Sequence, residues 1–156
     1  YRIDEIRSAI GLEQLRKLRR GNERRAQFTN LYREMFRTAV PEIAVPFSQF
    51  AWDSSYHIMP ILLPPGTNRA RFAEGMKSRR IQTSLHYPPI HQFQYYRENG
   101  LVPRKQLLVT ENVASREVTL PLYPTMDPSS VELVVSAVRE AVREAHEPAV
   151  SKIQPS

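Results

Sequence analysis

The chain has 156 residues, of which 41% are hydrophobic, a composition typical of a globular protein with one core of ordinary size. It contains no cysteine, which excludes disulfides and thiolate metal sites and fits a reducing compartment. No apolar run approaches the roughly 20 residues of a membrane span, because Pro60 interrupts the longest candidate. We therefore expect a cytoplasmic protein with no membrane segment.

The net charge of +6 is concentrated at the start of the chain, where the first 40 residues carry ten lysines and arginines against five acids. Such a run can form a solvated helix face, meet an acidic surface of another domain, or bind the phosphates of a nucleic acid. The first two interpretations are favoured, because charge runs mostly lie on exposed faces and no nucleic-acid-binding motif accompanies this one. A basic nucleic-acid-binding module stays open as the less favoured alternative.

Residues 1–40 show apolar positions at helical spacing, with a weak point at Gly21 and Asn22. The pattern predicts two helices, or one kinked helix, that Pro41 ends.

Residues 54–63 suit a strand, and Pro60 within them indicates an edge position or a bulge. After the Pro-Pro-Gly sequence that follows, Thr67 is expected to cap a helix that ends near Arg79.

Residues 81–85 predict a second strand, residues 106–115 a further helix, and residues 118–122 a third strand. The final helix is the most clearly marked, with Asp127 as its cap, Pro128 at its first position and a stripe of valines and alanines behind them.

The alternation of helices and short strands predicts an α/β fold, with a small sheet of about three strands packed by helices and preceded by long connecting helices. We expect the connecting helices over residues 1–40, a small α/β domain over 41–146, and a frayed tail over 147–156.

The segment over residues 84–97 holds two imidazoles, three phenols, one guanidinium and an adjacent pair of prolines. Pro88 and Pro89 fix their own backbone angles and hold the residue before each of them in extended geometry. A stiff loop that carries hydrogen-bonding aromatic side chains is typical of a binding surface.

The sequence argues against a self-contained catalytic centre. His86 and His91 have neither helical spacing nor a nearby carboxylate, so we expect no metal site. The five glycines are isolated, so they form neither a nucleophile elbow nor a phosphate-binding loop.

Three segments together resemble the DegT/DnrJ/StrS family of sugar aminotransferases, and the likeness spans residues 1–145. The first is the opening YRIDEIRSAIGLEQL; HYPPIH at 86–91 and LPLYP at 120–124 are similar to later landmarks of that family, in the same order. The resemblance implies a pyridoxal-phosphate (PLP) enzyme of aspartate-aminotransferase-like fold. This chain would be its C-terminal small domain, with helices that connect it to a missing large domain.

The family's Schiff-base lysine precedes the point that corresponds to Tyr1, and none of the four lysines here matches it. The resemblance therefore implies no catalytic residue in this chain, which we expect to be inactive alone and to act as part of a homodimer. In the family reaction an amino group passes from an amino acid donor, usually glutamate, to a keto sugar nucleotide.

By position in the family, Tyr1 and Arg2 would lie near the cofactor or the subunit interface, although a packing pair at the helix start explains them equally well. His86, Tyr87 and His91 would face the sugar or its diphosphate, and Leu120 to Pro124 would be architectural, with Tyr123 packed. Dehydration or regulation instead of amino transfer stays open, as does a dimerisation module without enzymatic activity.

Overall fold

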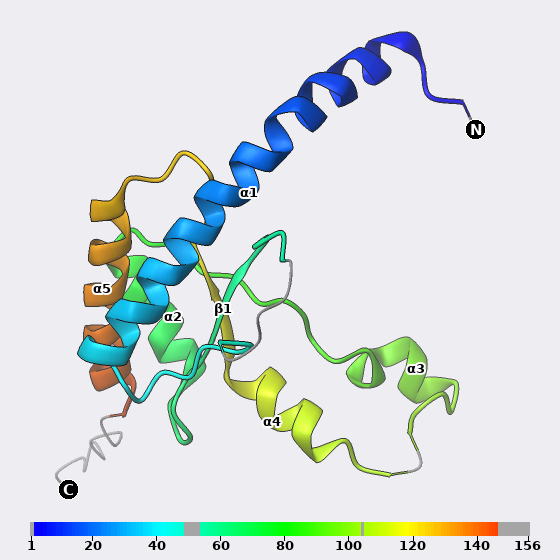
Figure 1. Ribbon diagram of the computed structural model, residues 1–156. Helices are drawn as coiled ribbons and strands as arrows, with labels where there is room; N and C mark the ends of the chain where they lie inside the picture. Colours follow the sequence, from blue (N-terminus) through cyan, green and yellow to red (C-terminus); the bar gives the residue numbers. More distant parts are fainter. Residues whose placement is uncertain (1, 49–53, 104, 147–156) are drawn as a thin grey trace, which may run out of the picture.

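The computed structural model describes residues 2–48, 54–103 and 105–146, and it confirms the α/β class (Figure 1). Three helices, α1, α2 and α5, group beside a small antiparallel sheet, while α3 and α4 lie apart from them (Figure 1). In this part of the chain no helix combines the length and the apolar character that crossing a membrane requires. The tail predicted over residues 147–156 lies outside the described residues.

Helix α1, Glu5–Ala39, is one unbroken helix of 35 residues, where the sequence predicted two helices or a kinked one. Asp4 caps its N-terminus. The break predicted at Gly21 and Asn22 is absent because the Asn22 side chain accepts a hydrogen bond from Arg25, one turn on, and does not compete for the backbone. A single glycine costs a helix only about 1 kcal/mol, which ion pairs along the helix and tertiary packing can offset.

The two halves of α1 differ in burial. Every described residue up to position 20 is exposed, whereas the second half inserts Phe28, Tyr32 and Phe36 into the core. These three rings recur every four residues and so lie on one helix face. The first half of α1 consequently projects from the body of the domain (Figure 1).

The sheet has two strands, β1 (Met59–Leu62) and β2 (Glu117–Leu120), paired antiparallel with Met59 opposite Leu120. The second predicted strand, residues 81–85, is reduced to one isolated bridge between Ser84 and Thr119. Pairing ends there because the chain soon reaches two prolines, which cannot donate to a ladder.

Pro60 is tolerated within β1 because no backbone N–H is required at this position to donate a hydrogen bond to β2. Its partner Thr119 uses both its N–H and its C=O with Ser84, on the opposite side of β2. The expectation of an edge position for this proline agrees with that arrangement.

Helix α2, Arg69–Ser78, begins one residue later than predicted. Asn68 is its cap and accepts a hydrogen bond from the N–H of Arg71 (3.1 Å), while the Thr67 hydroxyl lies 2.8 Å from Nε2 of His146. The prediction of Thr67 as the cap was therefore wrong.

Helix α5, Pro128–His146, starts where the sequence predicted, and Asp127 accepts a hydrogen bond from the N–H of Ser129 (3.1 Å). It packs against α1 and α2. Most of the largest fully buried side chains of the core come from both strands and from α1, α2 and α5, and include Tyr32, Phe28, Phe36, Phe72, Met59, Ile61, Met76, Val131 and Val135.

Residues 85–116, here called the arm, extend away from the core. They contain a short 3-10 helix (Ile90–Gln92), α3 (Gln94–Glu98) and α4 (Leu108–Arg116), none of which has a buried residue. The helix predicted over 106–115 is confirmed as α4. Two arginines hold it to the body: Arg69 donates to the carbonyl of Ala114, and Arg116 donates to the carbonyl of Leu63 (2.9 Å).

Candidate functional site

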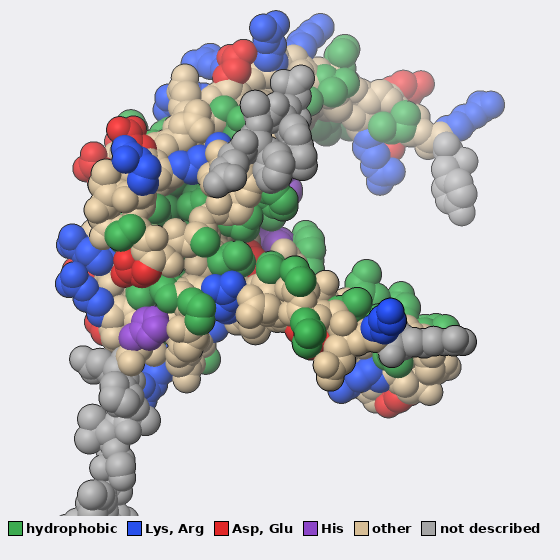
Figure 2. Space-filling model, turned by 60° about the horizontal axis from the view of Figure 1, so that its bottom comes forward, with side chains coloured by type: hydrophobic (Ala, Val, Ile, Leu, Met, Phe, Trp, Pro, Cys, Tyr) green, Lys and Arg blue, Asp and Glu red, His purple; other side chains and the backbone are tan. Residues whose placement is uncertain are grey.

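The projecting half of α1 and the arm border a hollow, with histidine side chains visible at its inner end (Figure 2). Large apolar side chains are exposed on both projections, and each of the following is at least half exposed: Ile6, Ile10 and Leu15 on α1, and Tyr87, Ile90 and Val109 on the arm. A lone domain rarely shows so much apolar surface to water, and such surfaces mark contacts with another domain or subunit.

His86 lies where the chain leaves the sheet and enters the arm. Its backbone N–H donates to Oε2 of Glu117 (3.1 Å), and its ring Nδ1 lies 2.9 Å from Oγ1 of Thr119. The Thr119 hydroxyl in turn donates to Oε1 of Glu117 (2.6 Å). Glu117 and Thr119 are 8% and 5% exposed, so a buried polar network holds a half-buried histidine.

Tyr87 is 77% exposed. Its ring meets that of His86 edge to face, with 4.8 Å between the ring centres. The structure therefore brings these two side chains together, with the phenol outermost.

His91 has a different environment. Its Nε2 lies 3.2 Å from Oε1 of Glu111 on α4, and its side chain is only 15% exposed. This pair ties the 3-10 helix before α3 to α4.

Each histidine thus has a carboxylate beside it where the sequence indicated none nearby: Glu111 pairs with the ring of His91, and Glu117 accepts from the backbone N–H of His86. Glu111 is 20 residues from His91 and Glu117 is 31 residues from His86 along the chain, so linear spacing gave no signal of them. The described residues hold no group of three or more side chains suited to a metal ion.

The other predicted residues lie elsewhere. Tyr1 is outside the described residues, and Arg2 is exposed just before α1. Pro121 accepts a hydrogen bond from Tyr32 (3.0 Å), which gives the segment from Leu120 to Pro124 a structural contact. Tyr123 is 49% exposed and not packed as predicted.

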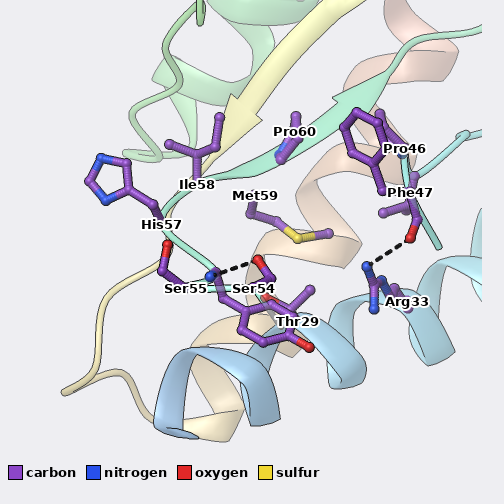
Figure 3. Close-up of a pocket in the computed structure, with 12 residues that line it drawn as sticks. Thr29, Arg33, Pro46, Phe47, Ser54, Ser55, His57, Ile58, Met59 and Pro60 are labelled. Carbon is purple, nitrogen blue, oxygen red and sulfur yellow. Dashed lines mark hydrogen bonds between the residues drawn. The ribbon is translucent and has the colours of Figure 1, made fainter. Parts of the chain in front are cut away.

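A separate cavity of about 360 Å³ lies between α1 and the segment that leads into β1 (Figure 3). Arg33 on α1 donates to the carbonyl of Phe47 across it (3.5 Å), and His57 is exposed at its rim. No acidic side chain is among the described residues that line it, so it lacks the connected polar groups found around His86.

The fold is shared with solved sugar aminotransferases. The chain superposes on PseC of Helicobacter pylori, an aminotransferase involved in the biosynthesis of pseudoaminic acid, with a TM-score of 0.83 and 27% identity, over 92% of this chain and 38% of PseC. It also superposes on DesV of S. venezuelae, solved in complex with a ketimine intermediate, with a TM-score of 0.78 and 26% identity, over 90% of this chain and 37% of DesV.

Residues 1–139 match the model of the DegT/DnrJ/EryC1/StrS aminotransferase family, and the chain belongs to this family. It is 31% identical over 147 residues to an uncharacterized protein of Methanocaldococcus jannaschii, which covers 92% of this chain and 38% of that protein. It is 28% identical over 145 residues to the spore coat polysaccharide biosynthesis protein SpsC of Bacillus subtilis, over 90% of this chain and 37% of SpsC. The chain therefore spans less than two-fifths of the length of these relatives.

Proposed function

We propose that this chain is the C-terminal small domain of a PLP-dependent sugar aminotransferase that moves an amino group from an amino acid, glutamate by preference, to a keto sugar nucleotide. The observation that carries the proposal is the family match over residues 1–139, together with a fold shared with sugar aminotransferases more than twice as long.

In this proposal the chain supplies only part of the cofactor site. Lys17 pairs with Glu13 on the outer face of α1 (3.4 Å), and Lys77 is exposed in the last turn of α2. Neither lies in the network around His86. We therefore assign the Schiff-base lysine to the large domain. To this chain we assign only Tyr1 and Arg2 as cofactor-binding residues, because the phenol of Tyr1 and the cation of Arg2 suit a phosphate.

PLP, when bound, supplies an electron sink for amino transfer. Within this chain, His86 and Tyr87 would orient the sugar nucleotide at the inner end of the hollow. His91, with its Nε2 already paired with Glu111, would hold the loop in place and contact the substrate less directly.

The exposed apolar side chains of α1 and the arm support a partner surface, which we assign to the large domain and to the second subunit of a homodimer. The basic residues of α1 fit a solvated face, since Arg16 and Lys17 pair with Glu13, and Arg19 pairs with Glu23. This pairing favours the aminotransferase over a nucleic-acid-binding module.

The test uses the full-length protein that contains this chain, and measures its two half-reactions separately. We expect His86→Ala to slow the half-reaction with the keto sugar nucleotide by about tenfold or more, and to leave the conversion of PLP by glutamate nearly unchanged. His146→Gln, a histidine change at the far end of α5, is the matched control.

Equal losses in both half-reactions would remove His86 from the substrate side. Failure of the full-length protein to bind PLP would overturn the proposal as a whole.

A further inference from the structure

The hydrogen bonds around His86 have a defined direction. A backbone N–H can only donate, so Oε2 of Glu117 is the acceptor for the amide of His86. The Thr119 hydroxyl gives its single proton to Oε1 of the same carboxylate. Oγ1 of Thr119 then has only lone pairs left for the ring of His86.

The contact of 2.9 Å between that oxygen and Nδ1 of His86 therefore requires a proton on Nδ1. In a neutral imidazole one nitrogen carries the proton and the other is an acceptor. With Nδ1 protonated, Nε2 of His86 presents a lone pair.

We propose that Glu117 and Thr119 are positioning residues that fix this tautomer of His86, so that its Nε2 accepts a hydrogen bond from a hydroxyl group of the sugar. The inference rests on the proposed function and selects between the sugar and the diphosphate as the group that His86 meets. A phosphate oxygen needs a donor, whereas a sugar hydroxyl donates to the lone pair.

The composition of β2 supports a role beyond packing. All four of its residues are buried, and Val118 and Leu120 are the apolar ones. Burying a carboxylate and a hydroxyl at the two remaining positions is costly unless each is hydrogen-bonded, and a pair of apolar residues would avoid that cost. Here the side-chain oxygens of the pair bond to each other and to His86.

A cation on the neighbouring helix also bonds near this network, but to main-chain carbonyls. Arg69 of α2 uses Nη1 on the main-chain carbonyls of Ala114 and Glu117. The ring of His86 is thus held at Nδ1 by Thr119, and the backbone N–H of His86 is held by Glu117. The ring also meets the ring of Tyr87 edge to face.

The experiment reads the tautomer directly in the full-length protein labelled with ¹⁵N-histidine. Long-range ¹H–¹⁵N correlation spectra distinguish protonated from unprotonated ring nitrogens, and His86→Gln assigns the signal. At a pH where the ring is neutral, we expect the proton on Nδ1. Thr119→Val keeps the shape but removes the acceptor, so we expect the proton to shift toward Nε2, and Thr119→Ser should restore the original tautomer.

A kinetic arm uses the same variants. For Thr119→Val we expect kcat/KM of the keto sugar half-reaction to fall about tenfold, for Thr119→Ser to recover it, and for the glutamate half-reaction to stay unchanged in both. Thermal melting of each variant separates these effects from a loss of fold.

A proton on Nε2 of His86 in the unchanged protein, or a tautomer that Thr119→Val leaves as it was, would overturn the inference. The tautomer does not depend on catalysis. A protein with the expected tautomer and no sugar half-reaction would therefore support the positioning of His86 while overturning its substrate role and the proposed function.

Discussion

The hydroxyl of Tyr32, on α1, donates a hydrogen bond of 3.0 Å to the main-chain carbonyl of Pro121, immediately after β2. The ring of Tyr32 is fully buried, and this burial raises the pKa of its phenol well above the ordinary value. Glu117 and Thr119, which hold His86, lie on β2. The hydrogen bond therefore joins α1, whose first half borders the hollow, to the end of the strand that holds His86.

Tyr32→Phe keeps the buried ring and removes the donor, which leaves the Pro121 carbonyl without this partner. We expect a loss of about 1 to 2 kcal/mol in the free energy of unfolding, measured by urea denaturation. Tyr123→Phe, at a half-exposed position, is the control and should change stability by less than about 0.5 kcal/mol. Similar values for the two variants would mean that the bond contributes nothing measurable.

Gly75 lies on the side of α2 that packs closely against α5. A Cβ added there would lie 3.2 Å from the Cβ of Ala141 and 3.1 Å from Oε2 of Glu144. The helix would gain about 1 kcal/mol in propensity from Gly75→Ala, but crowding in a packed helix pair costs about 1 to 3 kcal/mol. We expect a net loss of about 1 kcal/mol in chemical denaturation.

Gly11→Ala is the matched control, because a Cβ at Gly11 meets nothing within 4 Å. This change should stabilise by up to about 1 kcal/mol. A double-mutant cycle of Gly75→Ala with Ala141→Gly should show a coupling that restores part of the loss. Stabilisation by Gly75→Ala alone would show that the two helices can move apart freely.

The elements predicted well are those whose signals are local. The start of α5 follows from Asp127 and Pro128 and from a stripe of valines, all within one helix. The strand predicted over residues 81–85 failed for the opposite reason, because its pairing depends on Thr119, 35 residues beyond Ser84 and contacted only once the chain has folded.

In the candidate site, too, the local features were predicted and the distant partners were not. The stiffness of the loop at Pro88 and Pro89 was visible in the sequence, and so was its load of imidazoles and phenols. The partners of the histidines were not, since Glu111 comes from α4 and Glu117 from β2. Which acid meets which histidine is decided by packing, and no spacing rule covers it.

The cap of α2 offers a test at the point where the sequence allowed two choices. Asn68 accepts from the N–H of Arg71, whereas the Thr67 hydroxyl lies 2.8 Å from Nε2 of His146 at the end of α5. Asn68→Ala should cost about 1 kcal/mol in the free energy of unfolding, and Asn68→Gly only a few tenths, because glycine is tolerated at this position. Thr67→Ala should cost less than Asn68→Ala, and the reverse order would restore Thr67 as the cap.

The pairing of α2 with α5 through Arg79 predicts how stability depends on pH. Arg79 donates to Glu144 at 2.6 and 3.1 Å and to Glu140 at 3.0 Å. The hydrogen bonds from Arg79 hold the pKa of Glu144 below its usual range. Because the pKa is lowered in the folded state, the stabilisation is present above the unfolded-state pKa of about 4.3 and is lost as the pH falls through the folded-state value.

Glu144→Gln should therefore melt at a lower temperature than the unchanged protein at pH 7, by a small margin since the side chain of Glu144 is more than half exposed. That difference should shrink steadily as the pH is lowered from about 4.3, because the unchanged protein then also loses the charge of Glu144. Added salt at pH 7 should shrink it as well.

Glu132→Gln, at an exposed position on the same helix, serves as the control for removing one acid from α5. A melting difference for Glu144→Gln that persists unchanged at pH 3 would show that Glu144 acts through packing and not through its charge.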